Sequence, residues 1–563
     1  MTATAPTADP DTTPSPPGPA TVGLSRTADG REVPTARTRL AGRAPDDRLV
    51  GWLVTAGVTL LAGVLRFWNL GYPKQFLFDE TYYAKDAFSL WKFGYARDWV
   101  DKVNDAIVDG RYNPSMQKDT PSMVVHPEVG KWLIGAGEKL LGFDSLGWRL
   151  ASAVVGTLMV LVMVRLARRI TRSNLLGGVA GLLLCFDGLQ FVLSRLALLD
   201  IFVAFFLLSA VSCLVADRDW GRARMATLVE PGYAPGDGFG PVRGLRWRPW
   251  RLAAGVLFGL AIGSKWSALV PLAGLGLLVV VWDAGVRRSI GVRWAFVKAA
   301  VADGLLAFGY LVGVALVVYV ATWTGWLLHA HTYEVHLSDN NYGPYWGSYT
   351  KVQAHGFVDG LVQGLRSLYH YHRDVWSFHS HGLDGVTHVY ASNPGGWLIL
   401  NRPVGVAADL GIKPGTQGCN APADSTCLRQ VLLLGTPALW WMGVPALLYS
   451  AYSWIARRDW RFGLVVVGVL TTWLPFLPYA GRPIFSFYAV VTLPFTVLAL
   501  TLVVGRVLGS ELASRRRRTV GAVLAGAIVV LVMANFAWFW PIYTDQLLTT
   551  PQWLDRIWFR RWI

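Results

Sequence analysis

Residues 50–70 read VGWLVTAGVTLLAGVLRFWNL, an apolar run in which Arg66 is the single charged side chain. A helix needs roughly 20 apolar residues to cross the hydrocarbon of a bilayer, and this run meets that length. Shortly after it comes Phe78-Asp79-Glu80-Thr81-Tyr82-Tyr83, an acidic pair among aromatic residues. The sequence therefore predicts a first membrane span with two carboxylates just beyond its end.

The composition of the whole chain is that of a membrane protein. Of 563 residues, 53% are hydrophobic and 16% are charged, whereas roughly a quarter are charged in soluble globular proteins. The 27 tryptophans fit the aromatic belts that form at membrane interfaces. The net charge of +16 comes from arginines clustered between apolar stretches, and not from one basic face, so we expect no nucleic-acid partner.

Apolar stretches of spanning length recur along the chain and predict an all-α polytopic membrane protein. The length criterion gives about eleven spans. They lie near residues 50–70, 147–166, 174–192, 197–216, 251–267, 269–284, 298–326, 431–455, 461–479, 485–507 and 518–540. We find no internal repeat among them.

Arginine clusters mark alternate loops, and the positive-inside rule assigns such loops to the cytoplasm. The clusters fall within residues 165–172, 218–251, 287–293, 457–461 and 515–518. With eleven spans, this register predicts a plasma-membrane protein with its N terminus inside and its C terminus outside. Two long outer loops remain, residues 71–146 and 327–430. All ten histidines lie in these loops or at the helix end that leads into the second.

Residues 1–47 differ from the rest of the chain. They are rich in Pro, Thr, Ala and Gly and contain almost no large apolar side chains, which predicts a disordered cytoplasmic tail. The tail lacks the apolar core and cleavage site of a signal peptide. We therefore expect residues 48–563 to form one transmembrane domain that is addressed to the membrane by its own first helix.

The four cysteines divide between two environments. Cys419 and Cys427 lie close together in the second outer loop, where an oxidising compartment permits a disulfide, and we predict that they form one. Cys185 and Cys213 lie in apolar helices and are expected to be small buried side chains.

Asp79 and Glu80 are the first catalytic candidates. Acidic residues often begin helices because they stabilise the helix dipole, and that is the structural interpretation of the pair. A carboxylate at a lipid boundary, however, loses part of its hydration, which raises its pKa and suits it to act as a base. We therefore expect the pair to be functional.

Further candidates are cations near the outer ends of the spans, where topology does not require them. Such a cation either extends to the interface or binds a phosphate group held at the membrane. The cations of this kind are Arg66, Arg149, Arg195, Lys265 and Arg482. The segment from Val125 to Lys131 adds His126 and Lys131 beside a proline that begins a predicted helix, although an ordinary helix start explains it equally well.

Closely spaced histidines in the second outer loop raise the alternative of a zinc site. His370 and His372, like His379 and His381, are two residues apart, which on a helix points them to different sides. No HExxH pattern or cysteine completes a ligand set. We therefore predict that the site contains no metal.

Taken together, these segments resemble the protein O-mannosyltransferases, polytopic membrane glycosyltransferases of the GT-C type. The similar segments are Phe78-Asp79-Glu80 with the following tyrosines, His126-Pro127 to Gly130-Lys131, Arg149, Ser194-Arg195 to Leu199-Asp200, Ser264-Lys265, His379-Ser380-His381, His388 to Pro403 with Trp397 and Arg402, and Arg482, Phe485 and Tyr488. The second outer loop is too short for the β-trefoil insertion of the eukaryotic members. The chain is more similar to the compact bacterial, particularly actinobacterial, form.

The resemblance implies transfer of mannose from a polyprenyl-phosphate-mannose donor to Ser or Thr hydroxyls of secreted or membrane proteins, during or after their translocation. Asp79 would be the base, and Glu80 would bind the acceptor or orient the sugar, with inversion at the anomeric carbon. The lipid phosphate would be held by Arg149, Lys265 and Arg482. Weaker site candidates are His126, Lys131, Arg195, Asp200, His381 and Arg402. No cofactor is required in this scheme.

Two alternatives remain open. The first is another polyprenyl-phosphate-sugar transferase of the same fold that acts on a lipid, a glycan or Asn. An oligosaccharyltransferase should carry a WWDYG-type motif in its outer domain, whereas Trp440-Trp441-Met442 begins an apolar span. The second is a membrane transporter, whose charges should line a path through the membrane. Here the charges are concentrated in the outer loops, which disfavours that class.

Overall fold

The computed structural model describes nearly all of the chain from residue 47 onward, together with short pieces of the preceding tail. The described residues are 24–26, 32–34, 40, 47–123, 125–229, 233, 237–339, 345–352, 354–509 and 513–563. Most of the tail that we predict to be disordered, residues 1–47, lies outside them. Within it, Leu24–Arg26 (β1) pairs antiparallel with Glu32–Pro34 (β2).

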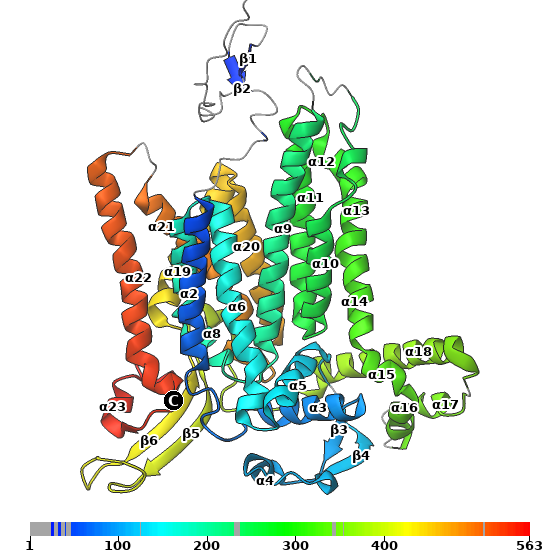
Figure 1. The fold of residues 1–563 in the computed structure, drawn as a ribbon, viewed down its shortest axis with the longest axis vertical. Coiled ribbons are helices and arrows are strands. Elements are labelled where there is room, and N and C mark those ends of the chain that lie inside the picture. The colour runs from blue at the N-terminus through cyan, green and yellow to red at the C-terminus, as the bar shows by residue number, and fades with distance from the viewer. Residues whose placement is uncertain are drawn as a thin grey trace, which may run out of the picture.

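Long helices run side by side through the molecule (Figure 1). Seven of them, among the described residues, are long and apolar enough to cross a membrane. They are α2 (Arg48–Phe67), α6 (Ser145–Thr171), α9 (Asp200–Leu228), η3 with α11 (Trp266–Ser289), the continuous α12–α14 segment (Ala295–Thr322), α20 with η8 (Trp460–Tyr479), and α22 (Arg515–Tyr543).

Shorter helices complete the bundle. They are α7 (Asn174–Cys185), α8 (Gly188–Leu193), α10 (Pro249–Ile262), α21 (Leu493–Leu508) and the 21-residue α19 (Pro437–Arg457). Each predicted span overlaps a helix of the bundle. Sufficient length and hydropathy are found for seven of them, so the predicted total of eleven crossings is not established.

Helix starts and burial explain the arrangement of the bundle. The side chains of Asp47, Asp144 and Ser514 accept backbone N–H groups at the starts of α2, α6 and α22, which satisfies donors that a helix leaves free. In α9, 83% of the most apolar window is buried, against 17% in α2 and 22% in α22. Helix α9 is therefore central, and α2 and α22 present their apolar surfaces to lipid.

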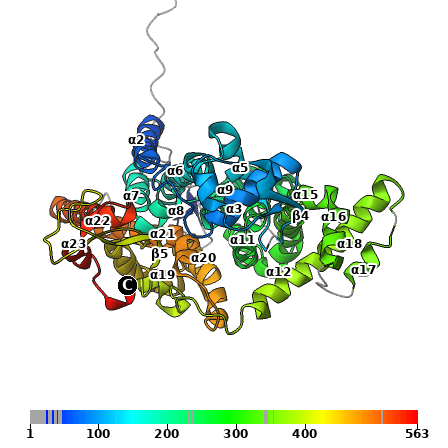
Figure 2. The ribbon, with the colours of Figure 1, turned by 90° about the horizontal axis from the view of Figure 1, so that it is seen from below.

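One end of the bundle is covered by an outer layer built from both predicted outer loops (Figures 1 and 2). The first loop forms α3 (Glu80–Phe93), β3 (Arg97–Trp99), α4 (Asn104–Val108), β4 (Gln117–Pro121) and α5 (Val129–Leu141). The second forms α15 (Thr324–Leu328), α16 (Ala330–Asp339), α17 (Trp346–Tyr349), α18 (Gly356–Ser377), η6 (Phe378–Gly382), η7 (Pro394–Ile399), β5 (Val404–Ile412) and β6 (Cys427–Leu433). Seen from below, α3 lies over the bundle and α18 extends to one side (Figure 2).

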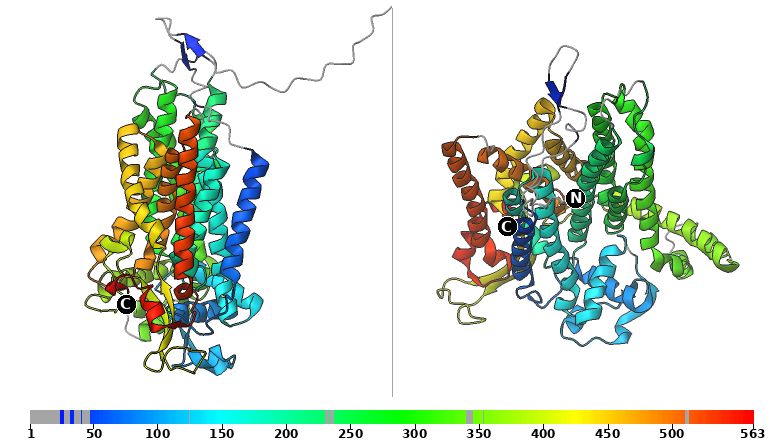
Figure 3. Two further views of the ribbon diagram at one scale, coloured as in Figure 1. Left: turned by 90° about the vertical axis from the view of Figure 1, so that its left-hand side faces the viewer. Right: turned by 45° about the horizontal axis from the view of Figure 1, so that its top comes forward.

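The outer layer also contains a three-stranded antiparallel sheet, which the all-α prediction misses. Strands β5 and β6 form a hairpin, and Leu548–Thr549 (β7), which follows α22, pairs with the start of β6. The predicted disulfide is present between Cys419 and Cys427 in this hairpin. Helix α23 (Thr550–Leu554) and the C terminus lie in the same layer (Figure 3, left).

At the opposite end of the bundle, a buried ion network joins three helices. Asp217 of α9 accepts hydrogen bonds from Arg248 at 2.6 Å and Arg251 at 2.8 Å. Arg251 also donates to Asp283 of α11 at 2.8 Å. All four side chains are buried, so removing one charge leaves the others without compensation in a medium of low polarity.

We predict that Asp217→Asn destabilises the bundle by about 3 kcal/mol, because Arg248 and Arg251 lose their shared carboxylate. The matched control is Asp219→Asn, because Asp219 and its partners Arg169, Arg172 and Arg218 are more exposed than the Asp217 network. Ion pairs closer to solvent contribute less, about 1 kcal/mol when exposed. Thermal unfolding of the purified protein in detergent measures both. Equal midpoints for the two variants would contradict the prediction.

Candidate active site

Asp79 occupies the N-cap position of α3, yet its side chain makes no capping hydrogen bond. Instead, the hydroxyl of Tyr83, one helical turn later, donates a hydrogen bond to the carboxylate. The preceding residue, Phe78, has a φ of 51°, a left-handed conformation that is uncommon for an aromatic residue. Its ring packs edge-on against Phe485 and Phe487, with ring centres 5.3 and 5.8 Å away. A simple helix-start role therefore does not account for Asp79.

Three of the sequence-predicted site residues meet at this point. Asp200 begins α9, and Lys265 immediately precedes η3 (Trp266–Ala268). The Lys265 ammonium lies 3.0 and 3.2 Å from the two carboxylate oxygens of Asp200 and 4.1 Å from the ring centre of Tyr488. Both Lys265 and Asp200 interact electrostatically with Asp79. The outer ends of separate helices therefore bring two carboxylates and one amine into a single cluster.

Burial sets the protonation of Asp79. Loss of hydration raises the pKa of this carboxyl to about 6, the nearby Lys265 opposes the rise, and Asp200 adds to it. A carboxylate with a pKa near 6 is a stronger base than an exposed one and is still ionised at neutral pH. Asp79 is therefore suited to accept a proton.

A second wall of the site comes from both outer loops. The rings of His126 and His379 stack with their centres 5.2 Å apart, and burial lowers the pKa of both imidazoles, so both are neutral at neutral pH. The guanidinium of Arg482 donates to the backbone carbonyl of His379. The Nε atom of Arg482 is buried and has no hydrogen-bond partner among the described residues. This wall thus offers a cation with an unused donor.

Glu80, the neighbour of Asp79, has a different environment. Its carboxylate accepts both Nε and Nη2 of Arg149 at 2.9 Å. It also accepts the backbone N–H groups of Leu77 and Ala197, each at 2.9 Å. The side chain is fully buried, and these four hydrogen bonds use its acceptor capacity. The predicted contact of Glu80 with acceptor or sugar does not fit this geometry.

Arg149 is saturated in the same way. Besides Glu80, it donates to the backbone carbonyls of Leu70, Pro73 and Gln75, at 3.4, 2.9 and 2.9 Å. A guanidinium has five N–H donors, and all of them are used inside the protein. In this structure Arg149 fixes the segment that leads into α3, and its predicted contact with the donor phosphate stays a prediction that would require one of these hydrogen bonds to break.

The remaining predicted site residues lie outside the cluster. Lys131 forms a buried ion pair with Asp86 of α3 at 2.8 Å. Arg195 donates to backbone carbonyls at the end of α2, and Arg402 donates to carbonyls near the C terminus. His381 is exposed in η6. Packing and backbone hydrogen bonds explain the positions of the first three, and their roles in the site stay predictions.

The sequence also leaves three side chains of the cluster without an assigned role. Tyr83 stands four residues after Asp79, a spacing that places both on one helix face and could have identified it. Tyr488 and His379 come from distant segments, and no local pattern connects them with Asp79.

Two closely spaced histidines of the second outer loop bond to tyrosine hydroxyls. His370 bonds to the hydroxyl of Tyr349 and His372 to the hydroxyl of Tyr319. Within the described part of the chain, no group of three or more His, Cys, Asp or Glu side chains is arranged to hold a metal ion. The expectation of a site without a metal stays a prediction.

Comparison with known proteins identifies the family. Residues 56–333 match the family model described as dolichyl-phosphate-mannose-protein mannosyltransferase. Residues 365–562 match the C-terminal four-transmembrane region of protein O-mannosyltransferase. The polyprenol-phosphate-mannose–protein mannosyltransferase of Mycolicibacterium smegmatis (strain MKD8) is 37% identical over 524 residues, covering 92% of this chain and 94% of that protein. The chain belongs to the protein O-mannosyltransferase family.

Other similar proteins agree with this assignment. The enzymes of the same name from Mycobacterium tuberculosis and Corynebacterium glutamicum are 36% and 30% identical, covering 93% and 90% of this chain and 94% and 92% of their own lengths. The solved Saccharomyces cerevisiae protein O-mannosyltransferase Pmt1-Pmt2 complex bound to the sugar donor has a TM-score of 0.65 at 14% identity, with 96% of each chain covered. This O-mannosyltransferase thus has the predicted GT-C-type membrane fold and is a glycosyltransferase.

We predict that Arg149→Met lowers the folding stability of the mannosyltransferase more than it weakens donor binding. Without its cation, Glu80 remains buried and uncompensated, which costs about 3–5 kcal/mol. The double variant Glu80→Gln/Arg149→Met should recover part of that loss. Thermal unfolding without donor provides the measurement. Wild-type stability of Arg149→Met together with a raised donor KM would instead return Arg149 to the phosphate site.

Proposed function

We propose that this enzyme transfers mannose from polyprenyl-phosphate-mannose to Ser or Thr hydroxyls of secreted or membrane proteins. The names and coverage of the mycobacterial relatives support the donor and the protein acceptor. The observation that carries the mechanism is the buried carboxylate of Asp79, with a pKa of about 6, beside Lys265.

In the proposed reaction, Asp79 takes the proton of the acceptor hydroxyl as its oxygen attacks the anomeric carbon of mannose. The bond from that carbon to the phosphate oxygen breaks, and its electron pair leaves with polyprenyl phosphate. Because a phosphate monoester is stable as an anion near neutral pH, no general acid is needed. Attack opposite the leaving group inverts the anomeric centre, as in single-displacement glycosyl transfer.

Two cations are proposed to stabilise the departing phosphate. Lys265 is held by Asp200 at 3.0 Å, and Arg482 has an unused buried donor at Nε. Fixed cations placed where charge develops lower the barrier without reorganising during the reaction. His126 and His379 line the same wall and are proposed to shape the sugar pocket. No metal or cofactor takes part in this scheme.

The proposed orientation follows from charge. Arginine clusters such as Arg515–Arg518 and Arg457–Arg458 lie at the end of the bundle opposite the outer layer (Figure 3, left), and such clusters face the cytoplasm. The active site then faces the outside of the plasma membrane. Acceptor proteins would reach it during or after translocation.

We predict that Asp79→Asn lowers kcat by about 10²–10⁴-fold, the usual contribution of a general base. The assay supplies the purified enzyme with labelled polyprenyl-phosphate-mannose and a Thr-rich peptide. Asp119→Asn is the matched control, because Asp119 is fully exposed in the same outer loop and should retain activity. Full activity of Asp79→Asn would refute its role as base, and transfer from a nucleotide sugar would refute the donor assignment.

The transfer rate should also depend on pH through Asp79. Only the ionised carboxylate accepts the proton, and burial raises its pKa in the free enzyme to about 6, so kcat/KM, which reports the free enzyme, should fall as the pH drops through about 6 and level off above it. His379→Gln removes a neighbouring imidazole and should leave the pH of this decrease unchanged. If the decrease at low pH disappears in His379→Gln, the titrating group is the histidine instead.

A further inference from the structure

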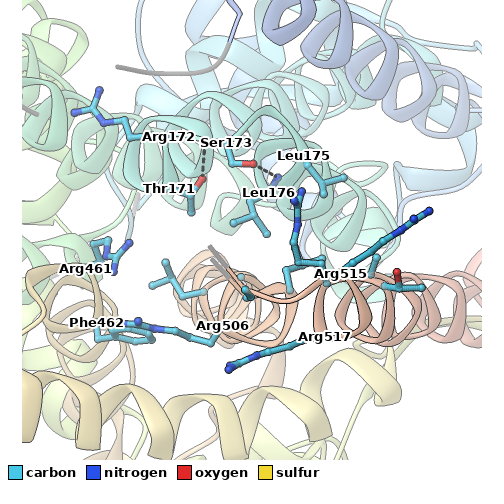
Figure 4. Close-up of a pocket in the computed structure, with 18 residues that line it drawn as sticks. Thr171, Arg172, Ser173, Leu175, Leu176, Arg461, Phe462, Arg506, Arg515 and Arg517 are labelled. Atoms are coloured by element: carbon cyan, nitrogen blue, oxygen red, sulfur yellow. Dashed lines mark hydrogen bonds between the residues drawn. The ribbon is translucent and has the colours of Figure 1, made fainter. Parts of the chain in front are cut away.

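A cavity of about 1260 Å³ lies at the end of the bundle opposite the active site. Its walls come from the turn between α6 and α7 and from α20, α21 and the start of α22 (Figure 4). Its arginines are Arg172, Arg461, Arg506, Arg515, Arg517 and Arg518. The described lining contains no Asp or Glu, and the one acidic residue that the sequence has between Gly509 and Ala513, Glu511, lies outside the described residues. Arginines outnumber carboxylates here, so the cavity carries a net positive charge.

Part of this charge is already compensated. Arg172 pairs with Asp219 at 2.7 Å. Arg461 and Arg506 share the carboxylate of Asp459, at 2.6 and 3.2 Å. One carboxylate between two guanidiniums leaves a net positive charge at this wall even where ion pairs form.

The other wall has an uncompensated excess. Arg515, Arg517 and Arg518 have no ion pair with any acidic side chain that the structure describes. They stand in the first turn of α22, which contains no acidic residue. The N-terminus of a helix is the positive end of its dipole, so cations there are unfavourable and an anion is stabilised. The sequence places one acidic residue, Glu511, close to the four arginines Arg515 to Arg518, so the turn still favours a further negative partner.

The rest of the cavity is apolar and continues toward lipid. Leu175, Leu176, Leu502 and Leu508 line it beside the arginines, and 61% of Leu175 is exposed. Helix α22, which forms one side, buries only 22% of its apolar window against protein. A small free anion would occupy the arginines and leave this apolar wall uncovered. A molecule with a charged head and hydrocarbon chains covers both.

We propose that this cavity binds an anionic phospholipid from the leaflet opposite the active site. Its phosphate lies against Arg515, Arg517 and Arg518, and its acyl chains run along α7 and α22. The lipid then connects α22, a peripheral helix, to α7 and α20. Binding to the folded state alone stabilises the protein by mass action.

The test measures lipid binding to the full-length protein in neutral detergent by native mass spectrometry, with the thermal unfolding midpoint as a second readout. The probes are dioleoylphosphatidylglycerol, dioleoylphosphatidylcholine and inorganic phosphate. The triple variant Arg515→Gln/Arg517→Gln/Arg518→Gln should bind phosphatidylglycerol about a hundredfold more weakly, since each arginine near a membrane surface contributes a few-fold to anionic lipid affinity. The three side chains are exposed, so the substitutions remove charge without breaking packing.

The matched control is Arg288→Gln/Arg457→Gln/Arg458→Gln, which removes three exposed arginines at the same end of the bundle but outside the cavity. It should bind phosphatidylglycerol like the wild type and show the same rise in unfolding midpoint. A single Arg517→Gln should weaken binding about fivefold. Equal binding by the two triple variants would overturn the proposal, as would equal binding of phosphatidylcholine. If inorganic phosphate raises the unfolding midpoint as much as the lipid does, the cavity is a site for a free anion instead.

Discussion

The bidentate pair between Glu80 and Arg149 fixes the geometry on which the active site depends. Both side chains are fully buried, and all their donors and acceptors are used within residues 70–80, α6 and Ala197. Two charges that have left water depend on one another, because separation would leave each uncompensated. The start of α3 therefore cannot move relative to α6. Asp79 is the adjacent residue, so its position beside Lys265 depends on this buried pair.

Two neighbouring carboxylates thus have opposite properties because their surroundings differ. Glu80 receives a guanidinium of its own and two backbone N–H groups. Asp79 accepts a hydrogen bond from a tyrosine hydroxyl and is attracted by Lys265, but the Lys265 ammonium bonds directly to Asp200. Desolvation without a dedicated cation raises the affinity of a carboxylate for a proton. One side chain is a structural anchor, and the other is the proposed base.

The sequence predicts the helices of the bundle and the central residues of the site, for identifiable reasons. Apolar length defines the spans, and Asp79, Asp200 and Lys265 stand out as charges at their outer ends. The partner of Glu80 could not be found in this way, since Arg149 lies 69 positions away and no local periodicity connects them. The contacts of Arg195 and Arg402 could not be predicted either, because both donate to backbone carbonyls, which any residue provides.

The sheet in the outer layer was missed for a related reason. Strand β7 has two residues and pairs with β6 across the whole of α19–α22. A strand that short has no alternating pattern of its own, and its pairing depends on where α22 returns the chain. Sequence reasoning limited to windows of about 20 residues cannot detect such a contact.

That late pairing also sets an order of assembly. Strand β6 has β5 on one side as soon as the hairpin is outside the membrane, but its other edge stays open until β7 arrives. Because β7 follows α22, the edge is covered only after the last membrane helix has inserted. A chain stalled before that step exposes an unpaired strand, and unpaired edges recruit other chains. Completion of the sheet thus distinguishes a chain whose last helix is in place from one that lacks it.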